Sequence, residues 1–196
     1  MTKNFIEHYA SLIKTPYQMQ SFLHALKYNA EENGETLRSA NEAFKAETAH
    51  CLEACFMAAA VLEKHNYPPL ALSLESVDCL DHVVYLFQYK KKWGAVGHSR
   101  DYGLHGRKAV FKTPRDVAES FIDAYVDSTG RIKAYAVIDL NECKSDWRNS
   151  TEFVWEVEQY ISDYPHKPLN CSESHYKKLY KRFIDGFKPL KKSYWL

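Results

Sequence analysis

The sequence predicts an α+β protein in which helices at both ends of the chain enclose an antiparallel sheet. Three observations carry this prediction. Apolar residues recur at helical spacing near the N-terminus, strand-like segments cluster between residues 70 and 111, and two further helical segments close the chain. Because the strands cluster and are joined by short turns instead of alternating with helices, α+β is favoured over α/β.

Four helices are expected before the first strand: over 3–13, from Thr15-Pro16 to Tyr28, over about 36–46, and from Thr48 to Pro68. Thr15 and Pro16 form a typical helix start, because threonine caps a helix and proline is tolerated at its first position. Thr48 is expected to cap the fourth helix, which would place Cys51 in its first turn. Cys55 then lies one turn later, on the face expected to pack in the core.

The sheet is expected to contain five strands: 70–74, His82–Tyr89, Trp93–Gly97, 108–111 and 132–140. The second and third are joined by a lysine-rich turn at 90–92. Thr113-Pro114 starts another capped helix, predicted to run to about Asp127, and helices over about 149–162 and 172–186 follow.

Composition limits the possible functions. The chain has 196 residues, of which 45% are hydrophobic, so one domain over 1–196 with one sizeable core is expected. The net charge of +1 gives no reason to expect nucleic acid or a membrane as partner. The five cysteines are odd in number and irregularly spaced, which favours a reducing, cytoplasmic compartment over a disulfide framework. The N-terminal residues predict no signal peptide or transmembrane helix.

The chemistry is expected at Cys51 and His82. A thiol at a helix N-terminus lies at the positive end of the helix dipole, which lowers its pKa. His82 opens a strand with apolar residues on its C-terminal side, so its ring is expected to be buried and to need a polar partner. A thiolate nucleophile requires a sulfur and a base of this kind.

These residues resemble the transglutaminase-like branch of the papain-like cysteine enzymes. That family carries Gly-x-Cys-x-x-x-Ala at a helix start, then Gly-Ile-Pro, a histidine strand, and a hairpin partner with Trp-x-x-x-Asp. Cys51, Pro68, His82 and the stretch from Trp93 to Gly97 match this order over about residues 36–112. The chain as a whole also resembles an uncharacterised bacterial group within the family. The resemblance implies a Cys helix packed on an antiparallel sheet and a catalytic Cys–His pair, but no aspartate stands at the third position.

The third catalytic residue is therefore sought near the end of the hairpin. A turn at 90–92 pairs His82 with about 98–100, which offers Ser99 first and His98 second as the residue that orients the ring. Asp101 could reach the ring only if the strand bulges. A serine hydroxyl can orient an imidazole but adds no charge, unlike a carboxylate.

Other residues around this pair have alternative interpretations. His50 either lines the cleft or is a solvated helix-terminus side chain, and His98 and Trp93 are expected to line the cleft. Cys79, His82, His98 and His105 include enough ligand types for zinc, but their spacing is wider than zinc sites use, so no metal or cofactor is expected. The basic, aromatic C-terminal helix favours a solvated amphipathic face over RNA binding.

The resemblance implies acyl transfer through a thioester on a peptide, protein or small amide substrate. Hydrolysis is favoured over cross-linking, because water is always available and no acyl-acceptor site is evident. The alternative is a catalytically silent member of the fold that binds a peptide or protein, which the missing aspartate favours. Oxyanion stabilisation is expected from the backbone N–H of Cys51 and one further donor.

Overall fold

The computed structural model describes residues 4–126, 128–186 and 191–196. Within these ranges the protein is α+β, with seven α-helices and a six-stranded antiparallel sheet. The helices are α1 (Phe5–Leu12), α2 (Pro16–Ala25), α3 (Ala40–Ala46), α4 (Cys51–Leu62), α5 (Pro114–Glu119), α6 (Trp155–Asp163) and α7 (Glu173–Ile184). Short 3-10 turns, η1 (Glu63–His65) and η2 (Leu140–Glu142), follow α4 and β7.

The main sheet has the order β6-β5-β4-β3-β7-β8. Its strands are β3 (Leu70–Ser76), β4 (His82–Tyr89), β5 (Lys92–Val96), β6 (Arg107–Phe111), β7 (Ile132–Asp139) and β8 (Lys167–Pro168). A separate two-stranded parallel pair joins β1 (Lys27–Tyr28) to β2 (Thr48–Ala49), immediately before α4. This pair ties the start of α4 to the end of α2.

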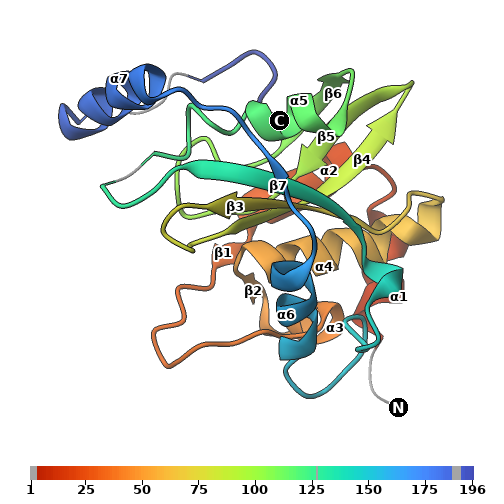
Figure 1. The fold of residues 1–196 in the computed structure, drawn as a ribbon. Helices are drawn as coiled ribbons and strands as arrows, with labels where there is room; N and C mark the ends of the chain where they lie inside the picture. Colours follow the sequence, from red (N-terminus) through yellow and green to blue (C-terminus); the bar gives the residue numbers. More distant parts are fainter. Residues whose placement is uncertain (1–3, 127, 187–190) are drawn as a thin grey trace.

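The two faces of the sheet pack against different helices. In the view of Figure 1, α1, α3, α4 and α6 lie below the sheet and α5 lies above it. The alternation of β4 explains this division: Tyr85 and Phe87 face the core around α4, whereas Val84 and Leu86 face the core around α5. Both layers are therefore needed to bury β4, the strand that begins with His82.

Helix α4 is buried on every side after its first residue. Its sequence is rich in alanine and other apolar residues, which suits a helix enclosed by α1, α3 and the sheet. Only the N-terminal end, at Cys51, is partly exposed. The fold thus brings a helix terminus to the surface at one point.

The structure confirms the α+β class and several helix starts. Thr15 and Thr113 cap α2 and α5 as predicted, in each case with proline in the first turn. Thr48 does not cap α4: it lies in β2, and His50 is the N-cap. Residue 3 and Asp127, which the sequence placed in helices, lie outside the described residues.

Helix α5 is shorter than predicted and ends at Glu119. The Ser120 hydroxyl donates to the Val117 carbonyl and accepts from the Arg107 side chain, and the chain continues in tight turns up to Ala124. Side-chain bonds of this kind compete with the helical pattern and end it. Among the residues that the structure describes, no helix combines the length and apolar character needed to cross a bilayer.

Candidate active site

Cys51 is the first residue of α4, and its partly exposed thiol lines a cleft. The backbone N–H groups at the start of a helix have no partner within the helix, so they favour negative charge beside them. The backbone N–H of Cys51 itself has no recorded acceptor in the described structure. The local structure therefore provides both an environment for a thiolate and one free donor.

Two imidazoles, those of His50 and His82, line the same cleft as the thiol of Cys51. Burial would raise the pKa of Cys51, but hydrogen bonds with His50 and His82, together with their positive charge, outweigh burial and lower that pKa to about 5. Burial would lower the pKa of His50, but the hydrogen bond and charge of Cys51, with Glu53, raise it to about 9. The favoured state at neutral pH is therefore a thiolate beside an imidazolium.

Cys55 shows what the helix start contributes. It lies one turn further along α4, fully buried, and burial raises the pKa of its thiol. It contacts the core and not the cleft, as the sequence indicated. Of the two cysteines on α4, only Cys51 can react as a thiolate.

His82 is buried at the start of β4, where it pairs with Leu74 of β3. Its Nε2 lies 2.8 Å from the carbonyl oxygen of Leu104. Because a carbonyl only accepts, Nε2 carries a proton, and Nδ1 is the nitrogen left for the sulfur of Cys51. The carbonyl of Leu104 thus fixes the tautomer and orientation of the ring, a role that a carboxylate often has.

Ser99 does not occupy the expected position beside His82. Its hydroxyl accepts a hydrogen bond from the backbone N–H of Asp101 at 3.0 Å, and the distal ring nitrogen of His82 is taken by Leu104. The predicted register is correct as far as it extends, since Tyr85 pairs with Val96, but the ladder between β4 and β5 ends there. Ser99 still lines the cleft.

The side chain of Gln20 explains why the strand ends before Ser99. Its amide donates to the Gly97 carbonyl and accepts from the Gly97 N–H, both at 2.9 Å. It thereby takes both backbone groups of Gly97 and diverts the chain from β4. A Cβ at position 97 would lie 2.6 Å from a Val84 methyl carbon, so only glycine allows this close approach.

Of the other residues considered for the site, His98 and Trp93 lie outside the cleft, and Asp101 lines it. His98 is buried next to Tyr28 and His105 and does not line the cleft. Trp93 pairs with Gln88 in the sheet, also outside the cleft. Asp101 lines the cleft, but its exposed carboxylate faces Arg100 at 3.5 Å. For His98 and Asp101 the cause is the diversion at Gly97, which directs residues 97–104 away from the sheet, whereas Trp93 stays within the sheet.

Arg107 holds the loop that carries Leu104. Its guanidinium is fully buried and donates to the carbonyl oxygens of Gly103, His105 and Gly106, on either side of Leu104. It also bonds to Ser120 and stacks 3.7 Å from the centre of the Phe121 ring. This clamp fixes the direction of the carbonyl that binds His82.

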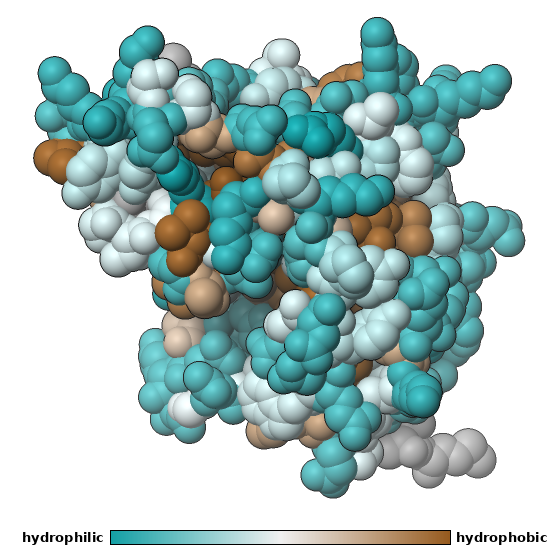
Figure 2. Space-filling model, in the orientation of Figure 1, coloured by the Kyte–Doolittle hydropathy of each residue, from teal (hydrophilic) through white to brown (hydrophobic). Residues whose placement is uncertain are grey.

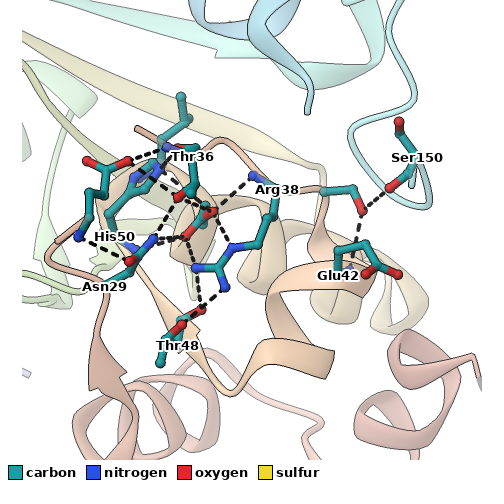
Figure 3. A network of polar contacts seen from close by, with 11 residues as sticks. Asn29, Thr36, Arg38, Glu42, Thr48, His50 and Ser150 are labelled. Atoms are coloured by element: carbon teal, nitrogen blue, oxygen red, sulfur yellow. Dashed lines mark hydrogen bonds and ion pairs between the residues drawn. The ribbon is translucent and has the colours of Figure 1, made fainter. Parts of the chain in front are cut away.

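A buried carboxylate lies beneath His50. Glu53 is fully buried and accepts hydrogen bonds from the backbone N–H and side chain of Arg38 at 2.7–2.9 Å, and from the His50 backbone N–H at 3.1 Å. Burial would raise the pKa of Glu53, but Arg38 and His50 lower it overall. Figure 3 shows Arg38 extending from this network to Thr48 of β2. The network fixes the backbone at the start of α4.

The cleft has a volume of about 1350 Å³. Its walls come from the start of α4, the segments around residues 80 and 100, the segment 28–36, and helices α6 and α7. The segment 28–36 contributes Tyr28, Glu31 and Glu35, and the two helices contribute Trp155, Glu158, Arg182 and Phe183. Figure 2 shows the surface indented between the lobe that carries α7 and the lobe below it. A cleft of this size can accept a peptide segment or a small amide.

Several residues of the site have no sequence signal of their own. The Leu104 carbonyl is a backbone atom, and Arg38 and Glu53 are common residue types at unremarkable positions. Only the spacing of His50 and Glu53 around a helix start gives a hint, because it matches a capping box. In the described parts of the chain, no three His, Cys, Asp or Glu side chains are arranged to hold a metal ion.

Comparison with protein-family models finds no model that matches the chain, and comparison with curated proteins finds no match either. The resemblance to the transglutaminase-like enzymes therefore stays a prediction.

Proposed function

We propose that the protein is a thiol-dependent amidase or acyltransferase with a transglutaminase-like core, in which Cys51 is the nucleophile and His82 transfers protons. The proposal is carried by the Cys51 thiol at a helix start and the His82 ring in the same large cleft, where the imidazoles lower the pKa of the thiol. All five cysteines are free, which fits a reducing compartment, and we place the reaction in the cytoplasm.

The reaction divides into two acyl-transfer steps. The Cys51 thiolate attacks the carbonyl carbon of an amide, and protonated His82 gives its proton to the leaving nitrogen as the carbon–nitrogen bond breaks. Water then attacks the thioester while His82 takes a proton from it, and the carbon–sulfur bond breaks to restore the thiolate. An amine in place of water would give transamidation by the same steps.

The oxyanion formed in each step needs hydrogen-bond donors. The free N–H of Cys51 supplies one. The Tyr28 hydroxyl is the candidate for the second, because Tyr28 lines the cleft and burial and the nearby thiolate raise its pKa, which keeps it protonated. Both donors are uncharged, so they add nothing to the positive charge already present around the sulfur.

The alternative is a binding module that uses the same cleft without turnover. The observation in its favour is that His82 bonds to the neutral Leu104 carbonyl, whereas no carboxylate among the described residues forms an ion pair with its ring in the way a triad aspartate does. A slow enzyme and a silent binder would share this geometry. The experiment must therefore detect single acylation events as well as turnover.

The test is intact-mass spectrometry of the protein mixed with activated esters, thioesters and peptide amides. We expect an acyl adduct on Cys51 that forms and then decays with release of the acid, and no adduct in Cys51→Ala. Cys55→Ala is the matched control, because its sulfur is buried away from the cleft. Ligand binding without any adduct, unchanged in Cys51→Ala, would favour the binding module and overturn the enzyme.

A further inference from the structure

The residue before the nucleophile is a histidine that caps its helix. His50 is the N-cap of α4, a position where serine, threonine, asparagine and aspartate are usual. Its ring accepts a hydrogen bond from the Leu52 N–H through Nδ1, at 3.2 Å. The same ring contacts the thiol of Cys51. A side chain that needed only to cap the helix would not require an imidazole.

The surroundings of His50 determine which ring nitrogen can exchange a proton. Nε2 lies 3.0 Å from the carbonyl oxygen of Thr36, so this nitrogen keeps its hydrogen. Nδ1 can then be in one of two states. Without a proton it accepts from the Leu52 N–H, and with a proton it must donate, for which the Cys51 thiolate is the adjacent acceptor.

We propose, on the basis of the acyl-transfer function above, that His50 is a second catalytic residue: its Nδ1 holds the proton taken from Cys51. His82 is then free to move protons between the leaving group and water. The sulfur–hydrogen bond breaks, the proton passes to Nδ1 of His50, and the thiolate and imidazolium remain paired. His50 keeps this proton through both acyl-transfer steps, so the thiolate that leaves the thioester finds its counter-ion in place.

Charged groups on every neighbouring element bear on this assignment. On α4, a carboxylate oxygen of Glu53 lies 3.9 Å from Nε2 of His50. In the segment before α3, Arg38 pairs with Glu53 and neutralises much of the charge of that carboxylate. On α6, Glu158 lies near enough for His50 to lower its pKa, although burial raises that pKa overall. On β4, His82 shares the sulfur. Glu53 and Glu158 are thus the carboxylates that favour the charged form of His50.

The two histidines can be separated by alkylating Cys51 without any substrate. The rate of iodoacetamide labelling at Cys51 is measured from pH 4 to 9 in the wild type, His50→Asn, His82→Asn and His8→Asn. Asparagine and serine both cap helices well, so His50→Asn and a second variant, His50→Ser, keep the helix start while removing the titrating ring. His8 lies exposed on α1 and is the matched control.

In the wild type and His8→Asn, we expect a labelling midpoint near pH 5. In His50→Asn and His50→Ser, the midpoint should move toward the ordinary thiol value of about 8.5, and further than in His82→Asn. A midpoint that moves as far or further in His82→Asn than in both His50 variants overturns the proposal. Circular dichroism of each variant shows whether it is folded.

Turnover provides the second readout. His82→Asn should abolish acyl transfer and His50→Asn should shift its pH profile upward. If no acyl substrate forms an adduct while the His50 variants still shift the labelling midpoint, the proposed acyl-transfer function is wrong. The ion pair between the Cys51 thiolate and the His50 imidazolium is then supported without it. If adducts form and the midpoint does not depend on His50, only the role of His50 fails.

Discussion

Two histidines of this protein, His50 and His105, have pKa values shifted in opposite directions. His50 and His82 contact the Cys51 sulfur in the cleft, and the pKa of His50 is raised to about 9. His98 and His105 lie outside the cleft, and the centres of their rings are 6.1 Å apart. Burial, with the charges of neighbouring histidines, lowers the pKa of His105 to about 4 and that of His98 as well.

The comparison shows that burial alone does not determine the state of a histidine here. His50 is partly buried like His105, yet one is charged at neutral pH and the other is neutral. The difference is the neighbouring group: a thiolate and Glu53 around the first, other imidazoles around the second. An anion within contact distance reverses the effect of desolvation.

The largest effect on the difference between His50 and His105 is expected when the Cys51 thiolate is removed. Cys51→Ala should abolish thiol-dependent activity completely and lower the pKa of His50, because burial then acts on the ring with less opposition. The side chain is small, so unfolding free energy should fall by only about 1 kcal/mol. NMR titration of the His50 ring measures the shift. A His50 pKa that stayed near its wild-type value would show that Glu53, and not the thiolate, determines the charge.

The reactivity of the Cys51 sulfur tests the same contrast, because a thiolate paired with an imidazolium should react at a lower pH than an ordinary thiol. At pH 6 Cys51 should be almost fully ionised, whereas an ordinary thiol is ionised to about 0.3%; after allowance for the weaker nucleophilicity of a low-pKa thiolate, labelling should be about tenfold faster. Peptide mass spectrometry compares Cys51 with the exposed Cys79 in the same sample. Equal labelling rates at pH 6 would mean that the thiolate is not formed.

The neutral pair should make the protein sensitive to acid. The pKa of His105 is about 4 in the folded state and about 6.5 when unfolded, so the unfolded chain binds more protons between these values. The contribution of His105 to the free energy of unfolding is complete above about pH 6.5 and is lost as the pH falls toward 4. At pH 5 the loss should be about 1–2 kcal/mol after solvent screening. Urea unfolding at pH 7 and 5 measures the loss, which His105→Asn should reduce.

The smallest effect is expected at Ser99. The hydroxyl bonds to the Asp101 N–H and not to His82, so Ser99→Ala should change turnover by less than about twofold. Ser99→Asp should not raise the rate, because position 99 does not face the ring nitrogen that Leu104 occupies. Steady-state rates of the three proteins across pH decide this. A tenfold fall in Ser99→Ala would restore the serine as the orienting residue.

The sequence was most informative where structure is determined locally. The bounds of β4, His82–Tyr89, agree with the prediction because apolar residues and the lysine turn mark both ends. The capped starts of α2 and α5 also agree, since an N-cap and a proline act over a single turn. Cys51 and His82, which these local signals placed at the start of a helix and of a strand, line the same cleft in the structure.

The parts that failed depend on contacts between distant residues. The expected place of Ser99 assumed that the hairpin continues, but Gln20 binds Gly97 across a separation of 77 residues and ends it. The group that orients His82 is a backbone carbonyl, which any residue type provides. The cap by His50 was missed because histidine is an uncommon N-cap and Thr48 is a usual one.

The contact between Gln20 and Gly97 also has a consequence for how the protein matures. Long-range contacts of this kind form late, because a large loop must close before they can form. Until then, we expect the segment around Leu104 not to hold the His82 ring in its final orientation. We expect the reactivity of Cys51 at pH 6 to rise when this contact forms, and a short pulse of alkylating reagent at successive times of refolding would measure when that happens.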